Sequence, residues 1–273
     1  MKRSYKPIEE LTICDNFMFV KVFSDAEIAK PFLKALLKVD IESVTVIGES
    51  HQQADPSKKF VRFDVVVKEN VSGKNSAEGV GRIFDLELQM VDTKELPLRA
   101  RYYQGICDTE TLGTSHRYGE LKEQYVIFIC PGDIFNRGRP IYEFENREKE
   151  DHSLTLGDRT YKIFLNFSRY DAVTDESVRS YLRYFATNEA ATVATRAIQN
   201  KVDFYHKDPK TRSDYMTFKD MLEDERDEGR KEGRKEGAET RNRELAKAFR
   251  DDGISLEIIS RRTGLSMKEI EAL

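Results

Sequence analysis

The sequence has few of the residues and runs that mark secreted, zinc-binding or membrane-spanning proteins. Its three cysteines, at positions 14, 107 and 130, lie in no Cys-x-x-Cys motif and are too few for a disulfide framework. Its four histidines lack the spacing of structural zinc ligands. No signal peptide is visible, and no apolar run approaches the ~20 residues that a membrane helix needs. These absences predict a soluble protein of the reducing cytoplasm that does not contact membranes.

The chain also lacks an excess of positive charge. Its 45 basic and 49 acidic residues give a net charge of −4. This balance excludes a protein that holds nucleic acid by bulk positive charge, so any such binding needs a local basic surface. Aromatic residues, by contrast, are plentiful, with 16 Phe and 12 Tyr among the 273 residues. Disordered chains are poor in aromatics, so a packed core is expected.

Composition divides the chain into three parts. Residues 1–205 have a globular composition, residues 206–243 are dense in charge, and residues 244–273 resemble a small helical unit. The apolar pattern predicts helices over residues 15–23, 26–37, 97–118 and 176–199, the third with breaks at Gly105 and Gly113. It predicts strands over 41–48, 60–68, 81–90, 125–130, 142–145 and 161–166. This order favours an α/β fold with a central mixed sheet flanked by helices.

The charged part carries a four-residue repeat, Glu-Gly-Arg-Lys, that begins at Glu228. Glu paired with Arg or Lys three or four residues later supports a helix by about 0.2–0.5 kcal/mol, whereas each glycine opposes it by about 1 kcal/mol. One interpretation is a solvated, partly helical linker. The other is a close-packed pair of helices that meet along a seam formed by Gly229, Gly233 and Gly237.

The last 30 residues show a helix-turn-helix-like pattern. Gly264 ends one short apolar helix, and Ser266 with Glu269 forms a capping box that begins the next. Arg261 and Arg262 could contact phosphates, which favours DNA binding. The alternative is a role in packing or assembly, because the second helix is short and acidic.

Two neighbouring strand candidates place acidic side chains on one face. Side chains alternate along a strand, so Asp64 points away from the apolar residues of the first, and Asp85, Glu87 and Gln89 share the polar face of the second. If the two strands form a hairpin, Asp64 lies near Glu87. Two carboxylates with water and phosphate oxygens suit Mg²⁺, which could promote phosphodiester hydrolysis. The same pattern also fits a half-exposed face on which these side chains are merely solvated.

The arrangement of Asp64 and the strand Glu87-Leu88-Gln89 resembles the PD-(D/E)XK nuclease superfamily. More narrowly, it is similar to the bacterial branch of Rpn-type recombination-promoting nucleases or transposases. Further segments carry the resemblance: residues 15–23, residues 99–103, residues 118–122 with the apolar segment 125–129 that follows them, the Glu-Gly-Arg-Lys repeat, and the closing Thr-Gly-Leu-Ser at 263–266. The resemblance implies a restriction-endonuclease-like core and a DNA substrate.

The resemblance also implies roles for individual residues. Asp64 and Glu87 would bind Mg²⁺, for which Mn²⁺ can substitute, and Gln89 would be the third catalytic residue. Gln89 stands where the superfamily usually has lysine, so it cannot supply a positive charge, and Phe63 replaces the proline of the motif. Asp15 is either an additional acidic site residue or a helix N-cap.

Arg99 and Arg101 follow the second strand on the predicted helix. One interpretation has an arginine bind a DNA phosphate while Tyr102 or Tyr103 packs; the other has surface arginines and core tyrosines. The sequence thus predicts a metal-dependent DNA endonuclease that promotes recombination or mobile-element activity, with a tail that forms homo-oligomers. The alternative is a catalytically inactive DNA- or protein-binding module that retains the fold.

Overall fold

The structure, a computed structural model, describes residues 5–52, 61–71, 80–112 and 116–273. The chain forms two compact units, Met1–Arg212 and Ser213–Leu273. The division after residues 205 and 243 that composition suggests stays a prediction. None of the helices within the described ranges is both long enough and apolar enough to cross a membrane.

The first unit is built on a six-stranded mixed sheet with the strand order β1-β2-β3-β4-β6-β5. The strands are β1 (Ser43–Gln52), β2 (Val61–Asn70), β3 (Val80–Leu88), β4 (Gln124–Cys130), β5 (Ile141–Phe144) and β6 (Thr160–Asn166). The first three pair antiparallel, β3, β4 and β6 run parallel, and β5 returns antiparallel to β6. The predicted α/β class with a mixed central sheet is confirmed, and the architecture is consistent with a restriction-endonuclease-like core.

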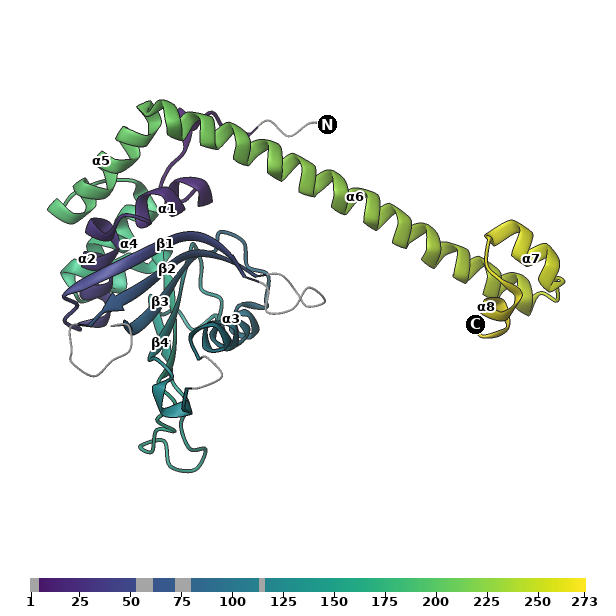
Figure 1. Ribbon diagram of the computed structural model, residues 1–273, viewed down its shortest axis with the longest axis horizontal. Coiled ribbons are helices and arrows are strands. Elements are labelled where there is room, and N and C mark those ends of the chain that lie inside the picture. Colours follow the sequence, from purple (N-terminus) through teal and green to yellow (C-terminus); the bar gives the residue numbers. More distant parts are fainter. Residues whose placement is uncertain (1–4, 53–60, 72–79, 113–115) are drawn as a thin grey trace. The chain divides into compact units, whose positions relative to one another are not determined.

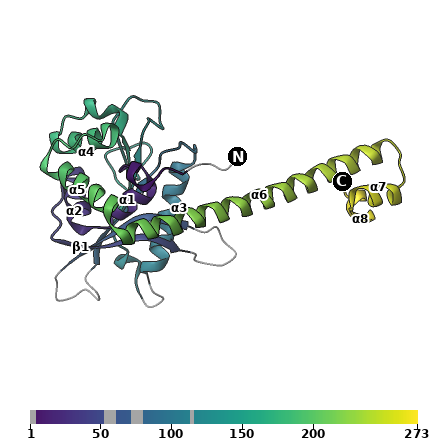
Figure 2. The ribbon, with the colours of Figure 1, turned by 90° about the horizontal axis from the view of Figure 1, so that it is seen from above.

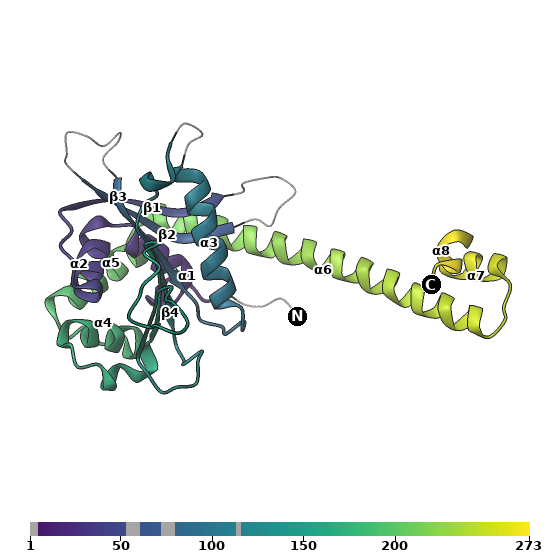
Figure 3. The ribbon, with the colours of Figure 1, turned by 90° about the horizontal axis from the view of Figure 1, so that it is seen from below.

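Helices cover both faces of this sheet. They are α1 (Asn16–Phe23), α2 (Ala26–Leu37), α3 (Leu96–Thr111), α4 (Glu176–Thr187) and α5 (Val193–Lys207), with short 3-10 segments at Ile8–Glu10, Tyr118–Glu120 and Phe167–Ala172. Helix α3 lies on one side of the strands, and the other four helices gather on the opposite side (Figures 1 and 3). The sheet is therefore the middle layer of three.

The apolar cores on the two faces differ in composition. Beneath α3, buried side chains from the helix and from the strands form one cluster, which includes Ala100, Tyr103, Val126, Phe128 and Phe164. The opposite core is an aromatic stack that joins α1, α2 and α4 through Phe19, Phe23, Phe32, Tyr181 and Phe185. Apolar burial is the main driving force for such packing.

Gly48 allows β1 to approach the helical layer closely. A Cβ atom at this position would lie 2.4 Å from Oγ of Ser24, the residue that ends α1. Any larger side chain would push the helix and the strand apart. This close approach places the C-terminal end of α1 against the sheet, and the first residue of the same helix, Asn16, contributes its side chain to the acidic cluster of β2 and β3.

Two helices differ from the expectation. The break predicted at Gly105 is wrong, because helix α3 runs through this residue and ends at Thr111. The break predicted at Gly113 lies outside the described residues. The predicted single helix over 176–199 is wrong, because Asn188 adopts a left-handed conformation with φ 58° that ends α4. Thr192 then caps α5, and a capping threonine favours a new helix at this point.

The second unit is helical throughout its regular structure. Helix α6 (Pro209–Asp251) contains the Glu-Gly-Arg-Lys repeat and runs without a break through residues 209–243 of the predicted linker. Helices α7 (Leu256–Thr263) and α8 (Met267–Glu271) lie beside the C-terminal end of α6 (Figure 2). A small core of Ala246, Ile259 and Ile270 holds these three helices together.

Candidate active site

Asp64 of β2 and Glu87 of β3 form the centre of the acidic cluster. The two strands are antiparallel neighbours, as expected, and Val65 pairs with Leu86. The backbone N–H of Asp64 donates to Oε1 of Glu87 at 3.0 Å, and the N–H of Leu88 donates to Oδ2 of Asp64 at 2.9 Å. Both side chains are buried. The strand pairing itself therefore fixes the two carboxylates side by side.

Asp85 is the third buried carboxylate of the cluster. It lies on β3, two residues before Glu87. In the described part of the chain, neither of its carboxylate oxygens has a hydrogen-bond partner. Burial, reinforced by the charge of Asp64, raises the pKa of Asp85 well above its usual range. Burial likewise raises the pKa of Glu87, and the charges of Asp85 and Asp64 add to this effect. The cluster thus concentrates negative charge that needs a cationic partner.

Arg99 of α3 brings a positive charge into the cluster. Its Nη2 lies 3.2 Å from Oε2 of Glu87 and 2.8 Å from the hydroxyl of Tyr103, and its Nη1 donates to Oε1 of Gln89 at 2.5 Å. The guanidinium also stacks over the rings of Tyr103 and Phe128, at 5.3 and 5.5 Å from their centroids. Burial opposes its charge, but Tyr103, Glu87 and Asp64 together raise the pKa of Arg99. Arg99 therefore stays charged.

Gln89 lies just after the last residue of β3. Its backbone N–H continues the ladder to the carbonyl of Ile129 at 2.9 Å. The side-chain oxygen accepts the hydrogen bond from Arg99, and the side-chain nitrogen donates to the carbonyl of Val91. Both ends of the amide are thus engaged, and Gln89 is linked to Glu87 through the shared arginine.

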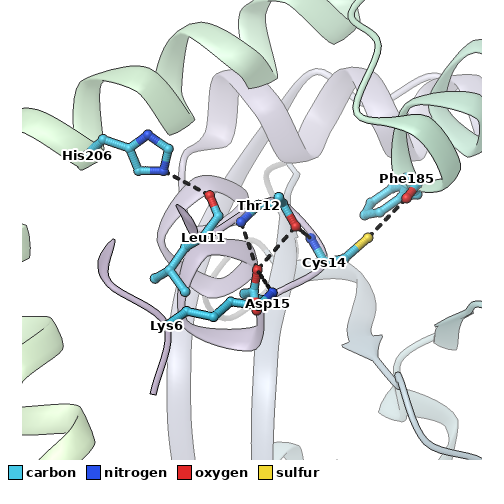
Figure 4. A network of polar contacts seen from close by, with 7 residues as sticks. All are labelled: Lys6, Leu11, Thr12, Cys14, Asp15, Phe185 and His206. Atoms are coloured by element: carbon cyan, nitrogen blue, oxygen red, sulfur yellow. Dashed lines mark hydrogen bonds and ion pairs between the residues drawn. The ribbon is translucent and has the colours of Figure 1, made fainter. Parts of the chain in front are cut away.

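The N-terminal segment contributes Asn16 to the cluster. Asn16, the first residue of α1, donates from Nδ2 to Oδ1 of Asp64 at 2.9 Å. The carboxylate of Asp15 instead accepts from Nζ of Lys6 and from the N–H of Thr12, each at 2.8 Å (Figure 4). Asp15 stands at the N-cap position of α1, without a side-chain bond to the helix N–H groups. Its role as an additional acidic site residue stays a prediction.

The two arginines predicted to bind DNA lie in different surroundings. Arg99 is directed at Glu87 and Gln89, and its side chain is 27% exposed. Arg101, two residues further along α3, is exposed. Binding of DNA phosphates by either residue stays a prediction, and for Arg99 the observed contacts indicate a place inside the cluster.

The donor set suits a hard divalent cation. Across residues 5–52, 61–71, 80–112 and 116–273, no three acidic, His or Cys side chains converge into a ready-made metal cage. Asp64 and Glu87 nevertheless offer adjacent carboxylates, and among the described residues the oxygens of Asp85 accept no hydrogen bond that satisfies normal geometry. Mg²⁺ typically takes one or two carboxylates and completes its coordination with water and phosphate oxygens. The residues therefore fit such an ion.

Replacing Asp85 by Asn should raise the melting temperature of the metal-free protein near neutral pH. The pKa of Asp85 is higher in the folded state than its usual value near 3.8. Between these two values the folded state binds more protons than the unfolded state, so stability is lost as the pH rises. Asn cannot ionise and removes this cost. We expect a gain of a few degrees, since about 1 kcal/mol shifts Tm by ~2–4 °C in a domain of this size.

Asp133→Asn is the matched control for this thermal measurement. Asp133 accepts hydrogen bonds from several backbone N–H groups, so its substitution should lower the melting temperature. A lower melting temperature for Asp85→Asn as well would contradict the account, because it would mean that the ionised Asp85 is stabilised in the folded protein.

Sequence reasoning did not select Asn16, Asp85 or Tyr103 as site residues. Asp85 was recognisable by alternation, because it shares a strand face with Glu87. The contact between Arg99 and Tyr103 also has a sequence signal, since residues four apart share one helix face. Asn16 has no such signal, because 48 positions separate it from Asp64.

Comparison with known protein families identifies the family of this chain. Residues 14–236 match the model of a family described as PD-(D/E)XK nuclease family transposase. This range includes every strand of the sheet and the acidic cluster of β2 and β3. No curated protein and no solved structure matches the chain significantly.

Proposed function

The chain belongs to the PD-(D/E)XK nuclease family transposases, and on this basis we propose that it is a metal-dependent endonuclease that hydrolyses phosphodiester bonds in DNA. The observation that carries this proposal is the pair of buried carboxylates, Asp64 and Glu87, locked together by backbone hydrogen bonds at the end of β3. Metal-assisted phosphodiester hydrolysis uses such oxygen ligands to hold the ion, together with a group that neutralises the developing charge.

Asp64 and Glu87 would hold the metal, which is Mg²⁺ with Mn²⁺ as a substitute. A bound ion supplies charge neutralisation at the phosphate and a lower pKa for a nearby water. In the reaction the water oxygen bonds to phosphorus while the bond from phosphorus to a sugar oxygen breaks. The water releases a proton to solvent, and the leaving sugar oxygen takes one up. Asn16 supports this by orienting the carboxylate of Asp64.

Arg99 would supply the positive charge that Gln89 lacks. The phosphorane-like transition state carries extra negative charge, and a fixed cation in a partly buried site stabilises that charge strongly. Arg99 touches both Glu87 and Gln89, so its positive charge lies directly beside the side chain of residue 89. Gln89 would then hold the guanidinium in position.

The biological role that we propose is promotion of recombination or mobile-element activity in the cytoplasm. The family description as a transposase supports this role. The cytoplasmic location is supported by three cysteines, Cys14, Cys107 and Cys130, that are free of disulfides.

A non-catalytic module that binds DNA or protein would differ in its affinity for metal. We expect Mn²⁺ titration, followed by electron paramagnetic resonance, to detect binding to the wild type. Glu87→Gln removes one of the two carboxylate charges that would hold the ion, so it should weaken this binding at least tenfold. A tenfold loss of affinity corresponds to about 1.4 kcal/mol. Equal and weak Mn²⁺ binding by both proteins would favour the non-catalytic module.

The tail would mediate homo-oligomerisation through α6. Its glycine seam of Gly229, Gly233 and Gly237 is open, because Cβ atoms placed there would meet nothing within 4 Å. Deletion of residues 214–273 should lower the molar mass measured by light scattering to that of a single chain. An unchanged mass would contradict this proposal.

Gly233→Leu tests whether the seam itself is the interface. Leucine favours a helix over glycine by about 0.8–1 kcal/mol, so α6 should persist, but its side chain would fill the seam. We expect the molar mass of the full chain to fall. If the mass falls with the deletion but not with Gly233→Leu, the α7–α8 end, with Arg261 and Arg262, is the better candidate for assembly or DNA contact.

A further inference from the structure

The loop of residues 131–140, between β4 and β5, is organised around one carboxylate. Oδ1 of Asp133 accepts from the N–H groups of Phe135 and Asn136, at 2.9 and 3.0 Å. Oδ2 accepts from the N–H groups of Arg137 and Gly138, at 2.8 and 2.6 Å. The negative charge of Asp133 is thus directed into the backbone of the loop.

Further contacts tie the loop to the sheet. The hydroxyl of Tyr142, on β5, donates to Oδ2 of Asp133 at 2.7 Å. Asn166, the last residue of β6, donates from its backbone N–H to the carbonyl of Pro140 at 2.7 Å and from Nδ2 to the carbonyl of Arg139 at 3.3 Å. Since both ends of the loop are anchored, the backbone of its two arginines is held in place.

Arg137 and Arg139 present positive charge beside an aromatic surface. Both residues are exposed, and among the residues that the structure describes neither side chain forms an ion pair. They line a cleft of about 640 Å³ together with Phe135, Tyr142 and Phe144. Phe144 is 42% exposed, so part of its ring is available for contact. Basic groups interleaved with aromatic rings are the features that bind a nucleic-acid strand.

The loop begins at the same end of the strands as the acidic cluster. Strands β3 and β4 run parallel, so Gln89 and the start of the loop follow their adjacent carboxyl ends. Strands are ~4.8 Å apart, which places β5 roughly 14 Å from β3 across the sheet. One DNA strand advances ~3.4 Å per nucleotide. A DNA strand whose cleaved phosphate lies beside Glu87 would therefore reach the loop within a few nucleotides.

A second cavity, of about 590 Å³, fits DNA poorly. Its charged lining consists of Glu143, Glu145 and Arg147, and Arg147 already pairs with Glu145. The net charge that remains is negative and would repel phosphates. Charge complementarity therefore favours the cleft that Arg137 and Arg139 line.

We propose that the loop of residues 131–140 is a phosphate-binding surface for the DNA strand next to the cleavage site, with Arg137 and Arg139 as the contact residues. This inference rests on the proposed nuclease function and extends it, because it assigns substrate binding to residues outside the acidic cluster. The arginines bind the backbone and carry no base specificity, so the contact is independent of sequence.

The test is the salt dependence of DNA binding by the full-length protein. Fluorescence anisotropy with a blunt duplex in EDTA, over a range of KCl concentrations, gives the slope of log K against log [KCl]. Each phosphate contact contributes about 0.9 to this slope, so the double variant Arg137→Gln with Arg139→Gln should lower its magnitude by about 2. Arg159→Gln is the control, because Arg159 precedes β6 at the opposite end of the strand from Asn166.

The outcomes separate this inference from the proposed activity. A reduced slope in the double variant alone, with an unchanged melting temperature, supports the surface, and it does so whether or not the protein cleaves DNA. An unchanged slope overturns the inference even if plasmid cleavage is normal. Absence of DNA binding by the wild type in EDTA would overturn the inference, whereas the proposed function is tested separately by plasmid cleavage with Mg²⁺ or Mn²⁺.

Discussion

Replacing Glu87 by Gln, or Asp64 by Asn, should abolish DNA cleavage while the protein stays folded. Each substitution keeps the size of the side chain but removes a carboxylate charge that would hold the metal. We expect the single-turnover rate to fall by about a thousandfold or more, the scale of losing one preorganised electrostatic contact. The fold should persist, because burial raises the pKa of Glu87 and the site therefore disfavours its charged form.

The matched control is Glu69→Gln, on the same strand as Asp64. Glu69 is also buried, and it pairs with Arg82 at 2.7 Å. The hydrogen bonds from Arg82 lower the pKa of Glu69, so its loss should reduce the melting temperature without reducing the cleavage rate. Equal loss of cleavage in Glu69→Gln and Glu87→Gln would contradict a specific role for Asp64 and Glu87.

Replacing Arg99 by Gln should have the second largest effect. It removes the guanidinium that contacts Glu87 and Gln89, and we expect the cleavage rate to fall by about 10²–10³. Mn²⁺ should bind more tightly to this variant, because a positive charge near the carboxylates has been removed. Tighter metal binding together with slower cleavage would support a catalytic role for the charge of Arg99 and would exclude a merely structural role.

A lysine at position 89 should rescue this variant. The double variant Gln89→Lys with Arg99→Gln returns one positive charge to the cluster from β3 instead of α3. We expect it to cleave at least ten times faster than Arg99→Gln. Arg82→Gln serves as the control, since it breaks a comparable Arg–Glu pair away from the cluster. No rescue by lysine, or an equal loss of cleavage in Arg82→Gln, would exclude the role proposed for Arg99.

The sheet and the acidic pair were predictable because their signals are local. Alternation along β2 and β3 places Asp64 and Glu87 on polar positions, and a hairpin between consecutive strands brings those positions together. The positions of α2 and β4 also follow from apolar spacing alone. Such periodic signals depend on the residues of one segment and not on its surroundings.

The rest of the site depends on tertiary packing. Helix α3 continues through Gly105 although glycine costs about 1 kcal/mol in a helix, because Leu96, Ala100 and Tyr103 are buried against the sheet. That packing turns Arg99 inward, whereas residue type alone suggests a surface arginine. Asn16 reaches Asp64 only because α1 is placed on the sheet. Neither placement can be derived from one segment.

The most direct test of the central claim is cleavage of supercoiled plasmid by the wild-type protein. The account predicts nicked or linear DNA with Mg²⁺ or Mn²⁺, none with EDTA, and none with Asp64→Asn or Glu87→Gln under the same conditions. Cleavage that persists in EDTA or in both variants would contradict the assignment of Asp64 and Glu87. Intact plasmid with either metal, from wild-type protein that binds both metal and DNA, would contradict the nuclease function itself.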